Sequence, residues 1–140
     1  MLFAMSDESL RSAGILLVVF PTVVGGGVSI LSLWLRRSPY YDHPLRPRLW
    51  AAGHAHAGVI LILSLVALVL VDHAALGDGW KRVVRTSIPA AAIAVPAAFF
   101  LSVVRPRVDR PDRLIPLAPA GAVALSIGLV ALGIGLLRAA

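Results

Sequence analysis

Apolar residues in this chain are gathered into four long runs. No Asp, Glu, Lys or Arg occurs in four stretches that together cover 90 of the 140 residues: 12–35, 49–71, 86–104 and 114–137. Their lengths are 24, 23, 19 and 24 residues. Because a helix needs about 20 apolar residues to cross the hydrocarbon core of a bilayer, each stretch predicts a membrane-spanning helix. We therefore expect an all-α membrane protein with four transmembrane helices in a single domain over residues 1–140.

The segments between these stretches are short and rich in turn-forming residues. Three prolines predict an extended first connector over 36–48, and a Gly-Asp-Gly sequence at 77–79 predicts a turn in the second. Small residues at helical spacing in the last stretch predict a close contact with another helix: Ala124 with Gly128, and Ala131 with Gly135.

Composition excludes several classes of function. The chain is 59% hydrophobic and 14% charged, whereas a soluble domain has roughly a quarter of its residues charged. The absence of cysteine excludes disulfides, thiolate zinc sites, iron–sulfur clusters and covalently attached c-type haem. The net charge of +6 comes from arginines and one lysine that flank the four stretches. This position predicts contact with lipid headgroups or an anionic cofactor, and not with nucleic acid.

Two histidines within the second stretch carry the candidate chemistry. They lie in the sequence G-H-A-H-A-G at 53–58. An ionisable side chain in an uncharged span is costly and indicates a functional site. Residues two apart on an α-helix point about 200° apart, so His54 and His56 cannot hold one metal ion together. Each ring instead serves a site on its own face of the helix. Gly53 and Gly58 would let a flat porphyrin approach the backbone, with an imidazole as axial iron ligand.

Other interpretations of the pair stay open from the sequence. A histidine in a membrane can simply hydrogen-bond a hydroxyl or carbonyl group of another helix, and the chain would then be an accessory or scaffold subunit without a cofactor. A metal or solute transporter is a third interpretation, weakened by the absence of Asp and Glu from the four stretches. His43 and His73 lie in polar connectors, where we expect loop chemistry and no coordination.

The four-span layout, with a His-x-His pair early in the second span, resembles one third of heme-copper oxidase subunit I. In that family, twelve helices form three four-helix arcs with pseudo-threefold symmetry, and one helix ligates both haems. The resemblance implies that His54 and His56 are axial iron ligands of haem b and that the haem serves electron transfer or oxidoreductase chemistry. This sequence has no match to the family's copper-site histidines, cross-linked tyrosine or proton-channel carboxylates, so the resemblance does not extend to oxygen reduction.

Arginines at the same membrane end as the pair are candidate partners of haem propionates. In the oxidase family, arginines at the outer face meet the propionates, which would place this end outside the cell membrane. The positive-inside rule places it inside, because it carries eight of the 13 basic residues. Ordinary contact with lipid headgroups is the alternative role for these candidates: Arg46, Arg48, Arg105 and Arg107.

Ligands on opposite faces of one helix also predict an assembly. Four short spans enclose too little volume to surround a porphyrin on both sides of the second helix, so at least one ring must face a neighbour. In a cyclic homo-oligomer, His54 of one chain would face His56 of the next across a shared haem, in a heterologous contact that closes as a ring. Three copies would reproduce the twelve-helix plan. We expect a homotrimer in lipid, with a dimer or tetramer as alternatives and a redox partner that the sequence does not name.

Overall fold

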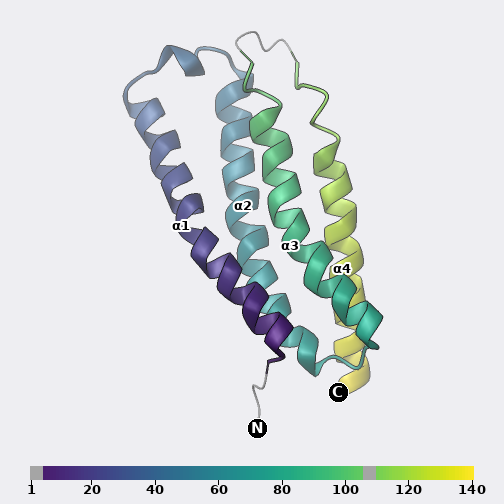
Figure 1. Ribbon diagram of the computed structural model, residues 1–140. Helices are drawn as coiled ribbons and strands as arrows, with labels where there is room; N and C mark the ends of the chain where they lie inside the picture. Colours follow the sequence, from purple (N-terminus) through teal and green to yellow (C-terminus); the bar gives the residue numbers. More distant parts are fainter. Residues whose placement is uncertain (1–4, 106–109) are drawn as a thin grey trace.

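The computed structural model describes residues 5–105 and 110–140 (Figure 1). Four long helices run through these residues: α1 (Asp7–Leu35), α2 (Leu45–Leu70), α3 (Asp78–Leu101) and α4 (Leu117–Ala139). Short 3-10 helices follow the first two: η1 (Pro39–Tyr41) and η2 (Val71–His73). Each long helix is of sufficient length and apolarity to cross a membrane. The described part of the chain therefore confirms the predicted all-α class and four helices that are long and apolar enough to span a membrane.

The helices stand side by side in the order of the sequence and form an open row (Figure 1). Helix α3 is the centre of the packing because it contacts both α2 and α4 along its length, while α2 and α4 touch each other little. Helix α1 packs mainly against α2. It lies close to α2 near the start of the chain and diverges from it toward the other end (Figure 1). This divergence opens a space beside α2 where His54 lies.

Two helices begin inside segments that we predicted as connectors. Helix α2 begins at Leu45, so the expectation of an extended connector over 36–48 was wrong for its last four residues, 45–48, which are helical. Pro44 precedes this helix and Pro47 lies in its first turn, where a missing N–H costs little because no helical acceptor exists there. Helix α3 likewise begins at Asp78, within the predicted turn. Helices α2 and α3 thus begin before the charge-free stretches that predicted them.

Glycines on one face of α4 let it approach α3 closely. Gly121, Gly128 and Gly135 are buried at intervals of seven residues. A Cβ atom built on Gly128 would overlap Ser87 Oγ and lie 2.6 Å from Ile88 Cγ1. The predicted close contact with another helix is confirmed at Gly128, and Ala131 on the same face is buried. Gly135 instead packs against Ala74 and Leu76, in the segment that precedes α3. Gly121, which the sequence analysis did not single out, extends the contact with α3.

A cluster of hydrogen bonds and ion pairs links the start of α1 to η2 and α3. Arg85 of α3 donates to Ser6 Oγ, Ser9 Oγ and Glu8 Oε2, each at 3.0 Å, and forms an ion pair with Asp72. Asp72 also accepts the Ser6 N–H at 2.9 Å. The side chains of Arg85 and Asp72 are only 13% and 9% exposed, so each depends on the other for charge compensation. Both residues lie between the second and third charge-free stretches, and the sequence analysis did not predict this cluster.

Replacing Gly128 with Ala should destabilise the protein, because the new methyl group must push α3 and α4 apart. We expect a loss of about 1–3 kcal/mol in the free energy of unfolding, the usual cost of overpacking. Gly133→Ala is the matched control on the same helix, since a Cβ atom there meets nothing within 4 Å. It should be neutral or slightly stabilising through helix propensity. Unfolding in detergent measures both variants, and equal stabilities would contradict this close contact.

Candidate functional site

His54 and His56 lie on different sides of α2, as their spacing predicts. His54 faces α1, where a Cβ atom built on Gly27 would lie 2.9 Å from His54 Nε2. His56 lies on the side of α3, with its ring centroid 5.2 Å from that of Phe99. Within residues 5–105 and 110–140, no group of three or more His, Cys, Asp or Glu side chains could hold a metal ion. The two imidazoles therefore belong to two separate sites.

His56 is exposed, and its ring is oriented by the backbone. Its Nδ1 lies 2.7 Å from the carbonyl oxygen of Ala52, one helical turn earlier. In the tautomer that donates this hydrogen bond, Nε2 has no hydrogen-bond partner among the described residues. Histidines that ligate metals usually donate their second ring nitrogen to a carbonyl or carboxylate in this way. The arrangement can therefore present Nε2 to a metal that approaches from outside the helix row.

His54 is half-buried and lines a groove of about 390 Å³ between α1 and α2. Its ring rests against the backbone of α1, because Gly26 and Gly27 have no side chains there. The volume is within the range of about 300–1,000 Å³ that is common for ligand sites. Most of the groove wall is apolar, and residues from both helices and from η1 form it: Gly27, Ile30, Leu31, Trp34, Tyr41, Pro47, Ala51 and His54.

The hydroxyl group of Tyr41 is a buried polar group at this groove. It has no hydrogen-bond partner among the residues that the structure describes. Burial raises the pKa of the Tyr41 phenol above its ordinary value, with the neighbouring Tyr40 as a smaller cause. The phenol therefore stays protonated at neutral pH and keeps a hydrogen to donate. No signal in the sequence distinguished Tyr41 from Tyr40, so the sequence analysis missed it.

The two glycines of the motif have different surroundings. A Cβ atom built on Gly53 would lie 2.9 Å from Phe100 Cε1, so α3 already occupies that face of α2. A Cβ atom on Gly58 would meet nothing within 4 Å. The surface that we predicted for a flat ligand is open at Gly58. At Gly53 the structure places an aromatic ring where the prediction placed a cofactor.

Arg46 is buried and holds the connector between α1 and α2 in place. Its guanidinium group donates to the carbonyl oxygens of Tyr40 at 3.0 Å and Arg105 at 2.7 Å. It also lies 4.3 Å from the centroid of the Tyr40 ring. These contacts join the start of α2, η1 and the segment after α3. They give Arg46 a structural role beside the groove, and its contact with a propionate stays a prediction.

Two of the other three candidate arginines lie at the surface. Arg48 is exposed, and the side chain of Arg105 is 74% exposed while it forms an ion pair with Asp112 at 3.1 Å. Arg107 lies outside the described residues. Arg48 and Arg105 thus provide positive charge at the membrane end near His54 and His56. Their contact with haem propionates stays a prediction.

The two connector histidines are placed away from the pair. His43 accepts the N–H of Leu45 at 3.3 Å through Nδ1, and this bond satisfies a free donor at the start of α2. His73 is exposed at the end of η2, beyond the far end of α2. Neither residue joins the groove.

Comparison with known proteins gives no match to a protein family, to a curated protein or to a solved structure. The resemblance to heme-copper oxidase subunit I therefore rests on the four-span layout and the motif at 53–58. A functional conclusion for this chain must come from the geometry of its own residues.

Replacing Tyr41 with Phe should leave the stability of the ligand-free protein unchanged or raise it by up to about 1 kcal/mol, because the hydroxyl is buried without a partner among the described residues. Tyr40→Phe is the matched control. The Tyr40 hydroxyl donates to the carbonyl oxygen of Val103 at 3.4 Å, and its removal should cost about 0.5–1.5 kcal/mol. Unfolding in detergent compares the two. A larger loss for Tyr41→Phe would show that its hydroxyl has a partner.

Proposed function

We propose that this chain is an integral membrane protein that binds haem b through His54 and His56 and uses it in electron transfer. The observation that carries the proposal is the imidazole of His56. It is exposed on an apolar helix, its Nδ1 is held by the Ala52 carbonyl, and its Nε2 is left without a hydrogen bond from the described residues. An ionisable ring in a span is costly unless a partner uses it. Haem iron is a partner that imidazole commonly ligates.

The surroundings of His54 fit the edge of a large flat group. Its groove is mostly apolar and has a volume of about 390 Å³. The Tyr41 hydroxyl supplies one hydrogen-bond donor with no partner among the described residues. When bound, haem would supply one-electron chemistry. The residues of this chain would hold the iron through imidazole nitrogens, orient the ring and keep water away from it.

The proposal extends to a cyclic homo-oligomer in the cell membrane, with a trimer favoured. His56 is exposed on the side of α3, and His54 opens to a groove on the side of α1. A haem held by His54 of one chain and His56 of the next would therefore join two different surfaces, and such a contact closes only as a ring. The twelve helices of three chains would also match the plan of the oxidase subunit.

A cofactor-free scaffold subunit is the second candidate function. Its support is the packing of His54 against Gly27, which already gives this ring a contact within the chain. The exposed apolar residues of α1, such as Val18 and Val28, would then cover a partner helix. Haem content separates the two candidates, because a scaffold is colourless when purified.

Replacing His54 or His56 with Ala should lower the haem content per chain by roughly tenfold or more, since each substitution removes one axial ligand. His43→Ala and His73→Ala are the matched controls and should leave the haem content near that of the parent, because neither residue lies at the groove. Haem extraction and quantification, after gel filtration to verify folding, measures all four variants. Full haem content in the first two would show that the ligands are elsewhere.

The mass of the complex in detergent tests the assembly. We expect three chains with one haem for each, because every shared site uses one residue from each of two neighbours. Native mass measurement reports the number of chains and of haems in one spectrum. A monomer that carries haem, or a ratio far from one haem per chain, would contradict the shared site.

A further inference from the structure

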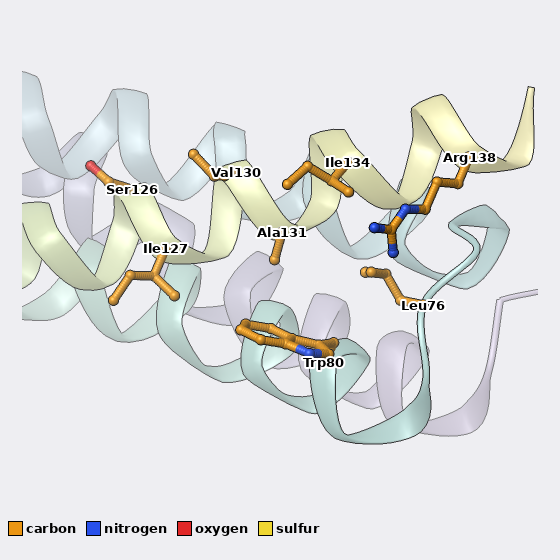
Figure 2. Close-up of a pocket in the computed structure, with 8 residues that line it drawn as sticks. All are labelled: Leu76, Trp80, Ser126, Ile127, Val130, Ala131, Ile134 and Arg138. Atoms are coloured by element: carbon orange, nitrogen blue, oxygen red, sulfur yellow. The ribbon is translucent and has the colours of Figure 1, made fainter.

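A second groove lies between α4 and the start of α3, at the end of the molecule that holds the C-terminus and the start of α1 (Figures 1 and 2). It has a volume of about 490 Å³. One wall is a face of α4, and Trp80 and Leu76 form the other (Figure 2). The α4 residues that line it are Ser126, Ile127, Val130, Ala131, Ile134 and Arg138. The groove is separate from the histidine site, which lies toward the opposite ends of the helices.

The groove is apolar along its length and has a cation at one end. Arg138 is exposed in the last turn of α4, and its guanidinium group extends toward Leu76 (Figure 2). No carboxylate of the described residues, the C-terminal one included, lies within ion-pair distance of it. Trp80 lies in the first turn of α3 with its ring along the groove. A tryptophan at this position is typical of the boundary between hydrocarbon and headgroups.

The length of the groove matches one leaflet of a bilayer. From Ser126 to Arg138 the helix rises about 18 Å, and one leaflet contributes about 15 Å of hydrocarbon. A chain that lies along α4 from Ser126 therefore reaches the headgroup region where Arg138 is. The apolar wall and the cation follow each other in the same order as the acyl chain and the phosphate of a lipid.

We propose that this groove binds one anionic phospholipid, with an acyl chain along Ile127, Val130 and Ile134 and the phosphate group at Arg138. Guanidinium groups form paired, charge-assisted hydrogen bonds with phosphate oxygens. Because Arg138 has no carboxylate partner among the described residues, a net negative headgroup supplies the compensating charge. A zwitterionic headgroup brings its own cation close to Arg138 and binds less well. The site requires neither haem nor a second copy of the chain.

Native mass spectrometry of the full chain in detergent tests this site, with phosphatidylglycerol and phosphatidylcholine of identical acyl chains added separately. We expect more bound phosphatidylglycerol than phosphatidylcholine. Arg138→Gln should lower phosphatidylglycerol binding by about fivefold, the effect of one arginine near an anionic surface, and leave phosphatidylcholine unchanged. Arg11→Gln, which changes an exposed arginine of α1 that does not line the groove, is the control and should change neither.

A second pair of variants tests the apolar wall. Val130 and Val123 are 61% and 60% exposed on α4, but only Val130 lines the groove. Val130→Trp should fill the groove and remove the bound lipid, whereas Val123→Trp should not.

Three results would overturn the proposal. The first is equal binding of the two lipids that Arg138→Gln does not change. The second is lipid binding that persists in Val130→Trp. The third is an adduct with inorganic phosphate alone, which would show that Arg138 binds the anion without using the groove.

Discussion

The turn of an α-helix by about 100° per residue places His54 and His56 on opposite sides of α2, and the elements around this helix are arranged accordingly. On one side, α1 brings Gly27 against the His54 ring, and a larger residue could not approach so closely. On the other side, α3 brings Phe99 to the His56 ring. The pair therefore cannot form one chelate, and any shared ligand has to join different surfaces. The placement of the two rings on two faces follows from this geometry, and it is the basis of the proposed assembly.

The open row of helices explains why both faces are accessible. Most burial is centred on α3, where the glycines of α4 allow close packing and where α2 contributes Ile60 and Ala67. Helix α1 has fewer contacts and is fastened near its start by the Arg85–Asp72 cluster. Its far half diverges from α2 and leaves the groove at His54. A closed four-helix bundle would bury this space, whereas a row keeps it open to lipid or to another chain.

Much of the fold was predictable from the sequence because charge-free runs of about 20 residues have one common solution in a membrane. The opposite placement of the two histidines was predictable for a similar reason, since it depends only on helix geometry. The helix ends were not predictable from the sequence, because Pro44 and Pro47 are compatible with both a loop and a first helical turn. The structural role of Arg46 was not predictable either, because the carbonyl oxygen of Arg105 that accepts its hydrogen bond lies 59 positions away in the chain. The different surroundings of Gly53 and Gly58 depend on the position of α3 relative to α2, and the sequence around the two glycines does not predict this position.

The absorption spectrum of the purified chain, recorded in the oxidised and the reduced state, tests the central claim most directly. Cells grown with sufficient iron and haem precursor should yield a coloured protein. Its spectrum should show a Soret band that sharpens on reduction and the resolved visible bands of low-spin, bis-imidazole haem. A folded protein without these bands, after incubation with added haem as well, would contradict haem binding and leave the two imidazoles as structural groups.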